Sequence, residues 1–348
     1  MPLPTVDTEF LLDFLTRLLN TPSPTGYTDK AITLCEETLA HFSGLTLERN
    51  RKGALMVEWP GENQDAPRAL TAHVDTLGAM VKEIKPNGRL KLTQIGGYAW
   101  NTIEGEGVTV FPSSGEPVRG SVLLSMASAH VHGRQVSETK RDEDSMEVRL
   151  DARTTSADET RQLGIEVGDF VALDPRVEIT NGFVRSRHLD DKACVACIIA
   201  AVKAMQDAGL PPKQRTHLLI SNYEEVGHGA STGFPPDLAE LVAVDMAAVG
   251  AGQTSDEFHA TLCVKDSGGP YHYELNQKLR QLAEEHSLPY KVDIYPYYGS
   301  DGEAYWRAGA DVAVALIGPG VDASHNYERT HTEALVATTQ WILAYLLS

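Results

Sequence analysis

Short apolar runs of strand length alternate along this chain with stretches of helical length, and this alternation constrains the fold more than any other feature. Three of the apolar runs end abruptly in polar or charged side chains: residues 69–75, 216–221 and 241–245. Stretches of helical length lie between or after them, at residues 193–207, 271–286 and 332–347. The alternation predicts an α/β fold with a mostly parallel central sheet and helices on both of its faces.

A different pattern occupies residues 77–175. Short β-like runs dominate there, and polar turns with glycine, such as residues 86–88 and 113–115, separate them. This pattern predicts a small all-β, barrel-like domain inserted into the α/β domain. We therefore expect one domain formed by residues 1–76 and 176–348, and an inserted β domain formed by residues 77–175.

The composition is that of an acidic globular protein. The chain has 348 residues, of which 42% are hydrophobic, so it can bury a large core. Its 30 basic and 48 acidic residues give a net charge of −18, which argues against nucleic acids and anionic membrane surfaces as partners. The longest uncharged apolar stretch, residues 193–202, is much shorter than the roughly 20 residues that cross a bilayer.

The start of the chain and its cysteines indicate a cytoplasmic location. The first residues lack the basic segment of a secretory signal. Four cysteines are too few for a disulfide framework in a chain of this size, which favours a reducing compartment. Cys194 and Cys197 form a C-x-x-C pair within a run of small apolar residues. We interpret this pair as buried helix packing rather than a redox or zinc motif.

Each of the three apolar runs ends in side chains that can bind metal or move protons. The first ends in His73-x-Asp75, a spacing that suits a metal-binding imidazole whose ring N–H is held by a carboxylate. Glu224 and Glu225 follow the second run, and Asp245 ends the third. Taken singly, these motifs have ordinary alternatives, because a pair of glutamates after a strand is usually a solvated loop.

Further candidates lie beside two of the expected helices. Asp190 and Asp191 come just before the helix at residues 193–207, where aspartates serve either as helix caps or as metal ligands. His325 and His331 precede the last helix. Oxygen and imidazole ligands without thiolates suit zinc, cobalt or manganese at a hydrolytic site. Two such ions need five or six groups, one of them a bridging carboxylate, and the chain offers that inventory.

With these motifs together, the chain resembles the tetrahedral (TET) aminopeptidase family, which includes glutamyl aminopeptidases and has dinuclear metal sites. The resemblance extends over nearly the whole chain and depends on several short segments: residues 23–26, 73–75, 95–97, 189–192, 224–227 and 244–245, and a histidine near the C-terminus. The inserted β domain also lies where this family has it, between the first two metal ligands.

The resemblance implies a role for each candidate residue. Asp190 is implied to bridge two divalent ions, with zinc as the expected metal. The other implied ligands are His73, Glu225, Asp245 and His325, with His331 as the alternative to His325. Asp75 would orient His73, and Glu224 would act as the general base that accepts a proton from the attacking water. Cobalt or manganese could replace zinc at these ligands.

Some motifs depart from the usual pattern of the family. The usual Glu-Ile-Gly after His-x-Asp is replaced by residues 76–78, Thr-Leu-Gly. The usual Gly-Thr-Asp-Ala becomes Gly-Ser-Asp-Gly at residues 299–302, where Asp301 is a candidate substrate-binding group. Near the C-terminus we favour His325 as the ligand, because His331 lies almost inside the start of the last helix. These changes affect the expected substrate preference rather than the metal ligands.

The resemblance predicts a metal-dependent aminopeptidase that removes the N-terminal residue of peptides. One alternative is a related amidohydrolase or deacylase that acts on a small blocked dipeptide or an amide-capped osmolyte. Another alternative is a non-catalytic, metal-binding scaffold. Self-association through the inserted domain is also implied, with a dimer as the building block and a dodecamer as the largest expected assembly.

Overall fold

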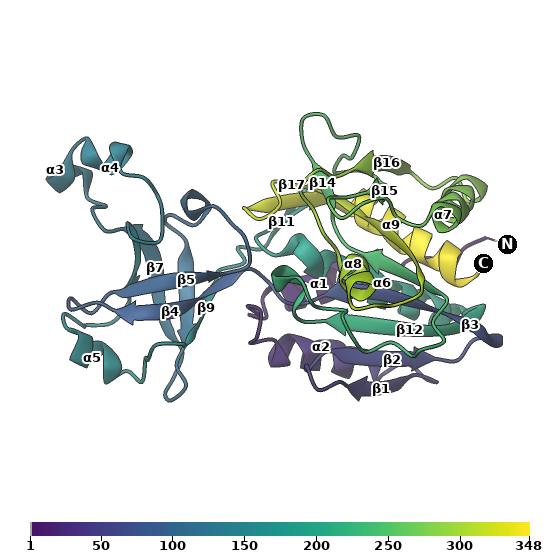
Figure 1. Ribbon diagram of the computed structural model, residues 1–348, viewed down its shortest axis with the longest axis horizontal. Coiled ribbons are helices and arrows are strands. Elements are labelled where there is room, and N and C mark those ends of the chain that lie inside the picture. The colour runs from purple at the N-terminus through teal and green to yellow at the C-terminus, as the bar shows by residue number, and fades with distance from the viewer. Residues whose placement is uncertain (1) are drawn as a thin grey trace. The chain divides into compact units, whose positions relative to one another are not determined.

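The computed structural model describes residues 2–348 and divides them into two compact units. One unit contains the residues up to Asp75 together with Arg176–Ser348, and the other contains Thr76–Pro175. Figure 1 shows a sheet with helices in the first unit and a small barrel in the second. Within the described residues, no helix is both long enough and apolar enough to cross a membrane.

The first unit is organised around a mixed sheet. Along the main path its strand order is β1-β2-β12-β3-β13-β17-β18-β11-β10, and β14, β15 and β16 pair alongside β17. The strands are β1 (Thr46–Arg49), β2 (Leu55–Trp59), β3 (Asn63–His73), β10 (Glu178–Thr180), β11 (Phe183–Ser186), β12 (Gln214–Ser221), β13 (Glu240–Val244), β14 (Ala247–Val249), β15 (Ala260–Lys265), β16 (Tyr290–Ile294), β17 (Ala313–Asp322) and β18 (Glu328–His331).

The predicted parallel arrangement holds for the centre of this sheet. Strands β12, β3, β13 and β17 run parallel to one another, whereas β2 pairs antiparallel with β12 and β18 pairs antiparallel with β17. The α/β fold class with an inserted barrel is confirmed, but the sheet as a whole is mixed rather than mostly parallel. The reason is that antiparallel neighbours, which need no crossover helix, extend both edges.

Helices cover both faces of the sheet. Alternate residues of the central strands point to opposite sides, and apolar side chains on both sides need to be buried. Leu70 and Val242 pack in one core with most of the helices, whereas Leu241 and Val314 pack in another core beside Trp306 of α8. The helices of this unit are α1 (Thr8–Leu19), α2 (Asp29–Leu39), α6 (Leu189–Ala208), α7 (Tyr273–Glu285), α8 (Asp301–Arg307) and α9 (Thr332–Leu346).

Helix α6 packs against the sheet and is buried almost throughout its length. Cys194 and Cys197 are both fully buried in it, and all four cysteines of the described chain are free. The pair therefore contributes to helix packing, as its apolar surroundings predict.

The second unit is a closed six-stranded barrel with the strand order β4-β5-β8-β7-β6-β9. Its core is formed by alternate inward-pointing side chains, such as Val108, Val110, Val122 and Leu124. The elements are β4 (Gly78–Ile84), β5 (Leu90–Ile95), β6 (Gly107–Phe111), β7 (Val118–Leu124), β8 (Met146–Leu150) and β9 (Phe170–Leu173), with the short helices α3 (Ala129–His132), α4 (Gln135–Glu138) and α5 (Ala157–Arg161).

The register of the parallel strands brings their C-terminal ends to one edge of the sheet. His73, the last residue of β3, lies opposite Ser221, the last residue of β12. Strand β13 pairs with β3 on its other side and ends at Val244. The polar residues that end or follow these strands are therefore held close together, at the edge where α/β proteins bind ligands.

Candidate active site

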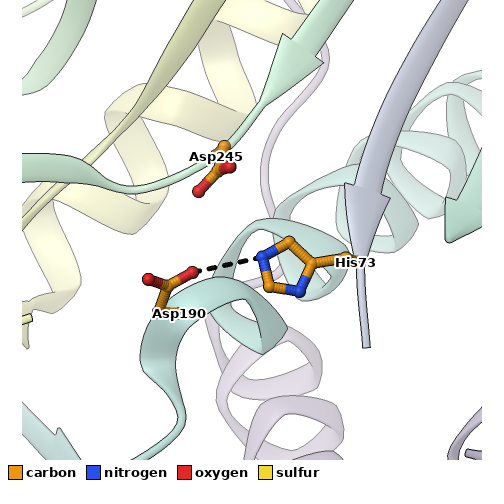
Figure 2. Close-up of side chains that lie close together, drawn as sticks. All are labelled: His73, Asp190 and Asp245. Atoms are coloured by element: carbon orange, nitrogen blue, oxygen red, sulfur yellow. Dashed lines mark ion pairs between the residues drawn. The ribbon is translucent and has the colours of Figure 1, made fainter. Parts of the chain in front are cut away.

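The end of β3 supplies a buried histidine to this edge. His73 has a relative exposure of 1%, and its Nδ1 lies 2.9 Å from the backbone oxygen of Asp75. Its Nε2 therefore points into the site and lies 3.2 Å from Oδ1 of Asp190. Figure 2 shows His73, Asp190 and Asp245 converging from the end of β3, the start of α6 and the segment after β13.

Asp190 is placed by an irregular first turn of α6. Its φ and ψ of −74° and 106° are not helical, and the peptide bond to Asp191 is cis. One carboxylate oxygen of Asp190 faces His73, and the other lies 3.4 Å from Nε2 of His325. Asp191 turns the other way and accepts a hydrogen bond from the backbone N–H of His73 at 3.2 Å. Only the first of the two aspartates thus faces both histidines.

His325 lies in the loop between β17 and β18. Its backbone φ of 62° is left-handed, and its side chain is 41% exposed. Its Nε2 lies 3.7 Å from Oε2 of Glu225, whose side chain is only 4% exposed. Glu225 comes from the short 3-10 turn Glu224–Val226 that follows β12.

The side chains therefore form two groups that share Asp190. The β3 group contains His73, Asp190 and Asp245, and the loop group contains Asp190, Glu225 and His325. Within each group the possible ligand atoms lie within 4.8 Å of one another. These are the five ligands that the resemblance to the TET family implies.

The chemistry of these groups fits divalent cations. Among the described residues, buried Oε1 of Glu225 and buried Oδ1 of Asp245 have no hydrogen-bond partner. Burial, followed by the charge of Asp190, raises the pKa of Glu225 to about 8 and that of Asp245 to about 7. Burial also opposes ionisation of Asp190, but hydrogen bonds from His325 and His73 outweigh it and lower the pKa. Crowded carboxylates of this kind need positive charge to stay ionised together.

Glu224 lies beside the β3 group. Its carboxylate is 3.6 Å from Nε2 of His73, and its side chain is 16% exposed. Burial raises the pKa of Glu224 well above its ordinary value, with the charge of His73 opposing the increase. A carboxyl group at the edge of a cavity with a raised pKa is suited to accepting and returning a proton.

Asp75 contacts more than the histidine that the sequence motif pairs it with. Its carboxylate oxygen is 3.5 Å from Nδ1 of His73, farther than its own backbone oxygen. The carboxylate accepts hydrogen bonds from the backbone N–H groups of Glu224 and Glu225 at 3.2 and 3.3 Å, and from the hydroxyl of Thr25 at 2.7 Å. Asp75 therefore holds the loop that carries both glutamates.

The sequence motifs miss one residue of the site. Glu328, which is fully buried, accepts hydrogen bonds from the backbone N–H of Asp190 and from that of His325, both at 3.0 Å. It therefore ties together two candidate ligands from distant segments. Glu328 and Thr330 alternate on the buried face of β18, and this spacing could have indicated a buried glutamate. The sequence pattern does not predict strand β18 itself, so the spacing could not be recognised.

Two candidates lie outside the ligand groups. His331 is the N-cap of α9, where its Nδ1 accepts a hydrogen bond from the backbone N–H of Glu333 at 3.2 Å. Asp301 has a relative exposure of 3%, and its carboxylate accepts hydrogen bonds from the N–H of Ala230 at 2.7 Å and from the hydroxyl of Ser221. Its oxygens are thus used within the protein rather than presented to the cavity.

A cavity of about 480 Å³ opens over the two groups. Part of its lining consists of ionisable side chains, namely Asp190, Glu224, Glu225, Asp245 and His325. The rest is neutral and consists of Gly227, Met246, Tyr297, Tyr298, Gly299 and Ser324. This volume is within the range of pockets that bind small molecules.

Comparison with known proteins defines the class of this molecule. A family model described as M42 glutamyl aminopeptidase matches residues 53–340. A protein of Bacillus subtilis (strain 168), provisionally named aminopeptidase YhfE, is 47% identical over 338 residues, which cover 97% of each chain. This 348-residue chain is therefore a hydrolase of peptide bonds, an aminopeptidase. It belongs to the M42 glutamyl aminopeptidase family, and the resemblance seen in its sequence is confirmed.

Solved structures show the same fold. The TET aminopeptidase from the marine sediment archaeon Thaumarchaeota archaeon SCGC AB-539-E09 superposes with a TM-score of 0.87 and 17% identity, over 98% of this chain and 96% of that chain. The TET1 peptidase of Pyrococcus horikoshii superposes with a TM-score of 0.83 and 20% identity, over 97% and 99% of the two chains. Both matches therefore include the inserted barrel as well as the sheet.

Proposed function

We propose that this aminopeptidase removes the N-terminal residue of peptides with two divalent cations and Glu224 as the general base. The observation that carries the proposal is the position of Asp190, whose two carboxylate oxygens lie 3.2 Å from His73 and 3.4 Å from His325. A carboxylate shared by two ligand groups is what a dinuclear hydrolytic site requires.

Each group would hold one cation. His73 and Asp245 would complete one site, Glu225 and His325 would complete the other, and Asp190 would belong to both. Imidazole and carboxylate ligands favour zinc, with cobalt and manganese as alternatives. When bound, the cations would polarise the scissile carbonyl and make water acidic enough to attack near neutral pH.

The remaining steps belong to the protein. Glu224 would take the proton of the attacking water on its carboxylate and pass it to the leaving amine. Asp75 is a positioning residue, because it fixes the imidazole of His73 through its backbone oxygen and the Glu224 loop through its carboxylate. The substrate's free α-amine would pair with the acidic lining of the cavity, which limits cleavage to the first residue.

The test is hydrolysis of aminoacyl p-nitroanilides by protein loaded with zinc, cobalt or manganese. Glu224→Gln should lower kcat by about 10²- to 10⁴-fold, the usual contribution of a general base, and leave the metal content unchanged. Loss of metal in this variant would show that Glu224 is a ligand instead. Absence of turnover with every metal and side chain would refute the proposal.

We further propose that the chain self-associates, with a dimer as the building block. The support comes from a structural neighbour, because the Pyrococcus horikoshii TET1 peptidase can assemble into a tetrahedron or a large octahedral shell. Light scattering of the full chain that finds only monomer would overturn this proposal.

A further inference from the structure

We infer that the cavity selects peptides whose first side chain is large and apolar, such as leucine or phenylalanine, and disfavours glutamate and lysine. This specificity depends on the proposed function, since it concerns the residue that is removed. It differs from the specificity in the family's name, glutamyl aminopeptidase.

The neutral part of the cavity provides the space for that side chain. Tyr298 forms a fixed wall, because its hydroxyl donates to the backbone oxygen of Met246 at 2.7 Å and its ring packs against Tyr295 with centroids 5.0 Å apart. Tyr297 beside it is 96% exposed and free to cover an apolar ligand. A Cβ atom added to Gly227 would meet nothing within 4 Å, so this part of the cavity is open.

The charges of the lining disfavour a glutamate side chain. The lining contains four carboxylates and, among the described residues, neither lysine nor arginine. Two divalent cations would balance these four charges and leave no net positive charge for a fifth carboxylate. Lys52 is not part of this lining, and its ammonium group donates to the backbone oxygens of His228 and Gly229. A buried carboxylate without a partner is costly.

Lysine is disfavoured for a complementary reason. All four carboxylates of the lining have other roles, three as ligands and Glu224 as the base. Asp301, the next candidate, is 3% exposed and accepts hydrogen bonds from within the protein. The substrate's α-amine would already occupy the acidic side of this lining. A lysine ammonium group on the neutral side would therefore lose water without gaining a partner of its own, whereas an apolar side chain would gain by burial against Tyr298.

The first experiment measures kcat/KM for Leu-, Phe-, Ala-, Glu- and Lys-p-nitroanilide with zinc-loaded protein. We expect the leucyl and phenylalanyl substrates to exceed the other three by about tenfold or more, the usual range for filling an apolar pocket. A glutamyl or lysyl substrate that equals or exceeds the leucyl one would overturn the inference.

A binding measurement separates this inference from the proposed function. Calorimetric titration of the zinc-loaded protein with free L-leucine, L-glutamate and L-lysine needs no turnover. Tighter binding of leucine without hydrolysis of any substrate would support the specificity and refute the proposed catalysis. Hydrolysis together with tighter binding of glutamate or lysine would support the proposed catalysis and refute the specificity.

A charge-insertion variant tests the location of the pocket. Tyr297→Lys places a cation on the neutral side of the cavity, at a position whose 96% exposure tolerates the change. We expect the ratio of glutamyl to leucyl kcat/KM to rise about threefold or more, the effect of a solvent-exposed ion pair. The matched control is Tyr273→Lys, which adds the same charge at a 70% exposed tyrosine outside the cavity. An equal change in both variants would contradict the proposed location.

Discussion

The two ligand groups of the site differ in how the chain holds them. In the β3 group, His73 ends a central strand and its side chain is 1% exposed. In the loop group, His325 lies in a loop with a left-handed backbone, and its side chain is 41% exposed. A ligand fixed by a sheet is positioned before metal binds, whereas a loop ligand depends on the hydrogen bonds that hold the loop. We therefore expect the β3 group to bind its cation more tightly.

The largest effect should come from the residue that the two groups share. Asp190→Asn removes the charged ligand proposed for both groups and should lower the affinity for both proposed cations by more than about 100-fold, the upper range for loss of a residue that merely supports a ligand. Metal content after dialysis, measured by mass spectrometry, checks this. Retention of one tightly bound ion would show that Asp190 serves only one group.

Stepwise removal of metal tests the comparison directly. A chelator such as EDTA should remove the cation of the exposed loop group first and that of the buried β3 group later. His325→Ala should leave about one ion per chain. This ion should be held by the β3 group with the affinity that the β3 group has in the unaltered protein. His73→Ala should leave one weakly held ion. If the remaining ion were tighter in His73→Ala than in His325→Ala, the expected order would be wrong.

Glu328 offers a subtler way to weaken the loop group. Glu328→Ala removes the acceptor of the N–H groups of both Asp190 and His325. The affinity of the loop group, which loses support at both residues, should fall by about 10- to 100-fold, and that of the β3 group, which loses support only at Asp190, should fall less. Glu328→Gln keeps one acceptor oxygen and should have a smaller effect. Isothermal titration with zinc measures both, and an equal loss at the two sites would indicate general unfolding of the site.

The smallest effect should come from Lys52, which holds the far end of the loop that carries Glu225. Lys52→Met removes hydrogen bonds to the backbone oxygens of His228 and Gly229 and should lower the free energy of unfolding by about 1 kcal/mol. The affinity of the loop group for its cation should fall several-fold. Lys52→Arg should recover part of both. Denaturant unfolding and zinc titration provide the measurements. Unchanged affinity in Lys52→Met would exclude a role in the metal site.

Much of the fold follows from local patterns. The apolar runs that end at His73, Ser221 and Val244 form parallel neighbours, because runs buried on both faces need helices on either side. The change of pattern after residue 76 predicts the inserted barrel. The antiparallel edges are not predicted, since strands β10, β11 and β18 are short and partly exposed and give little periodic signal.

The sequence by itself determined which chemical groups lie at the strand ends, because the residues next to one another in the chain set where each apolar run stops. Tertiary structure alone decided which of these groups meet. It placed His325 beside Asp190, it buried Asp301, and it brought Glu328 to the backbone of Asp190. Most of these outcomes depend on contacts between segments far apart in the chain, and no local pattern of side chains encodes the register and loop packing that create them.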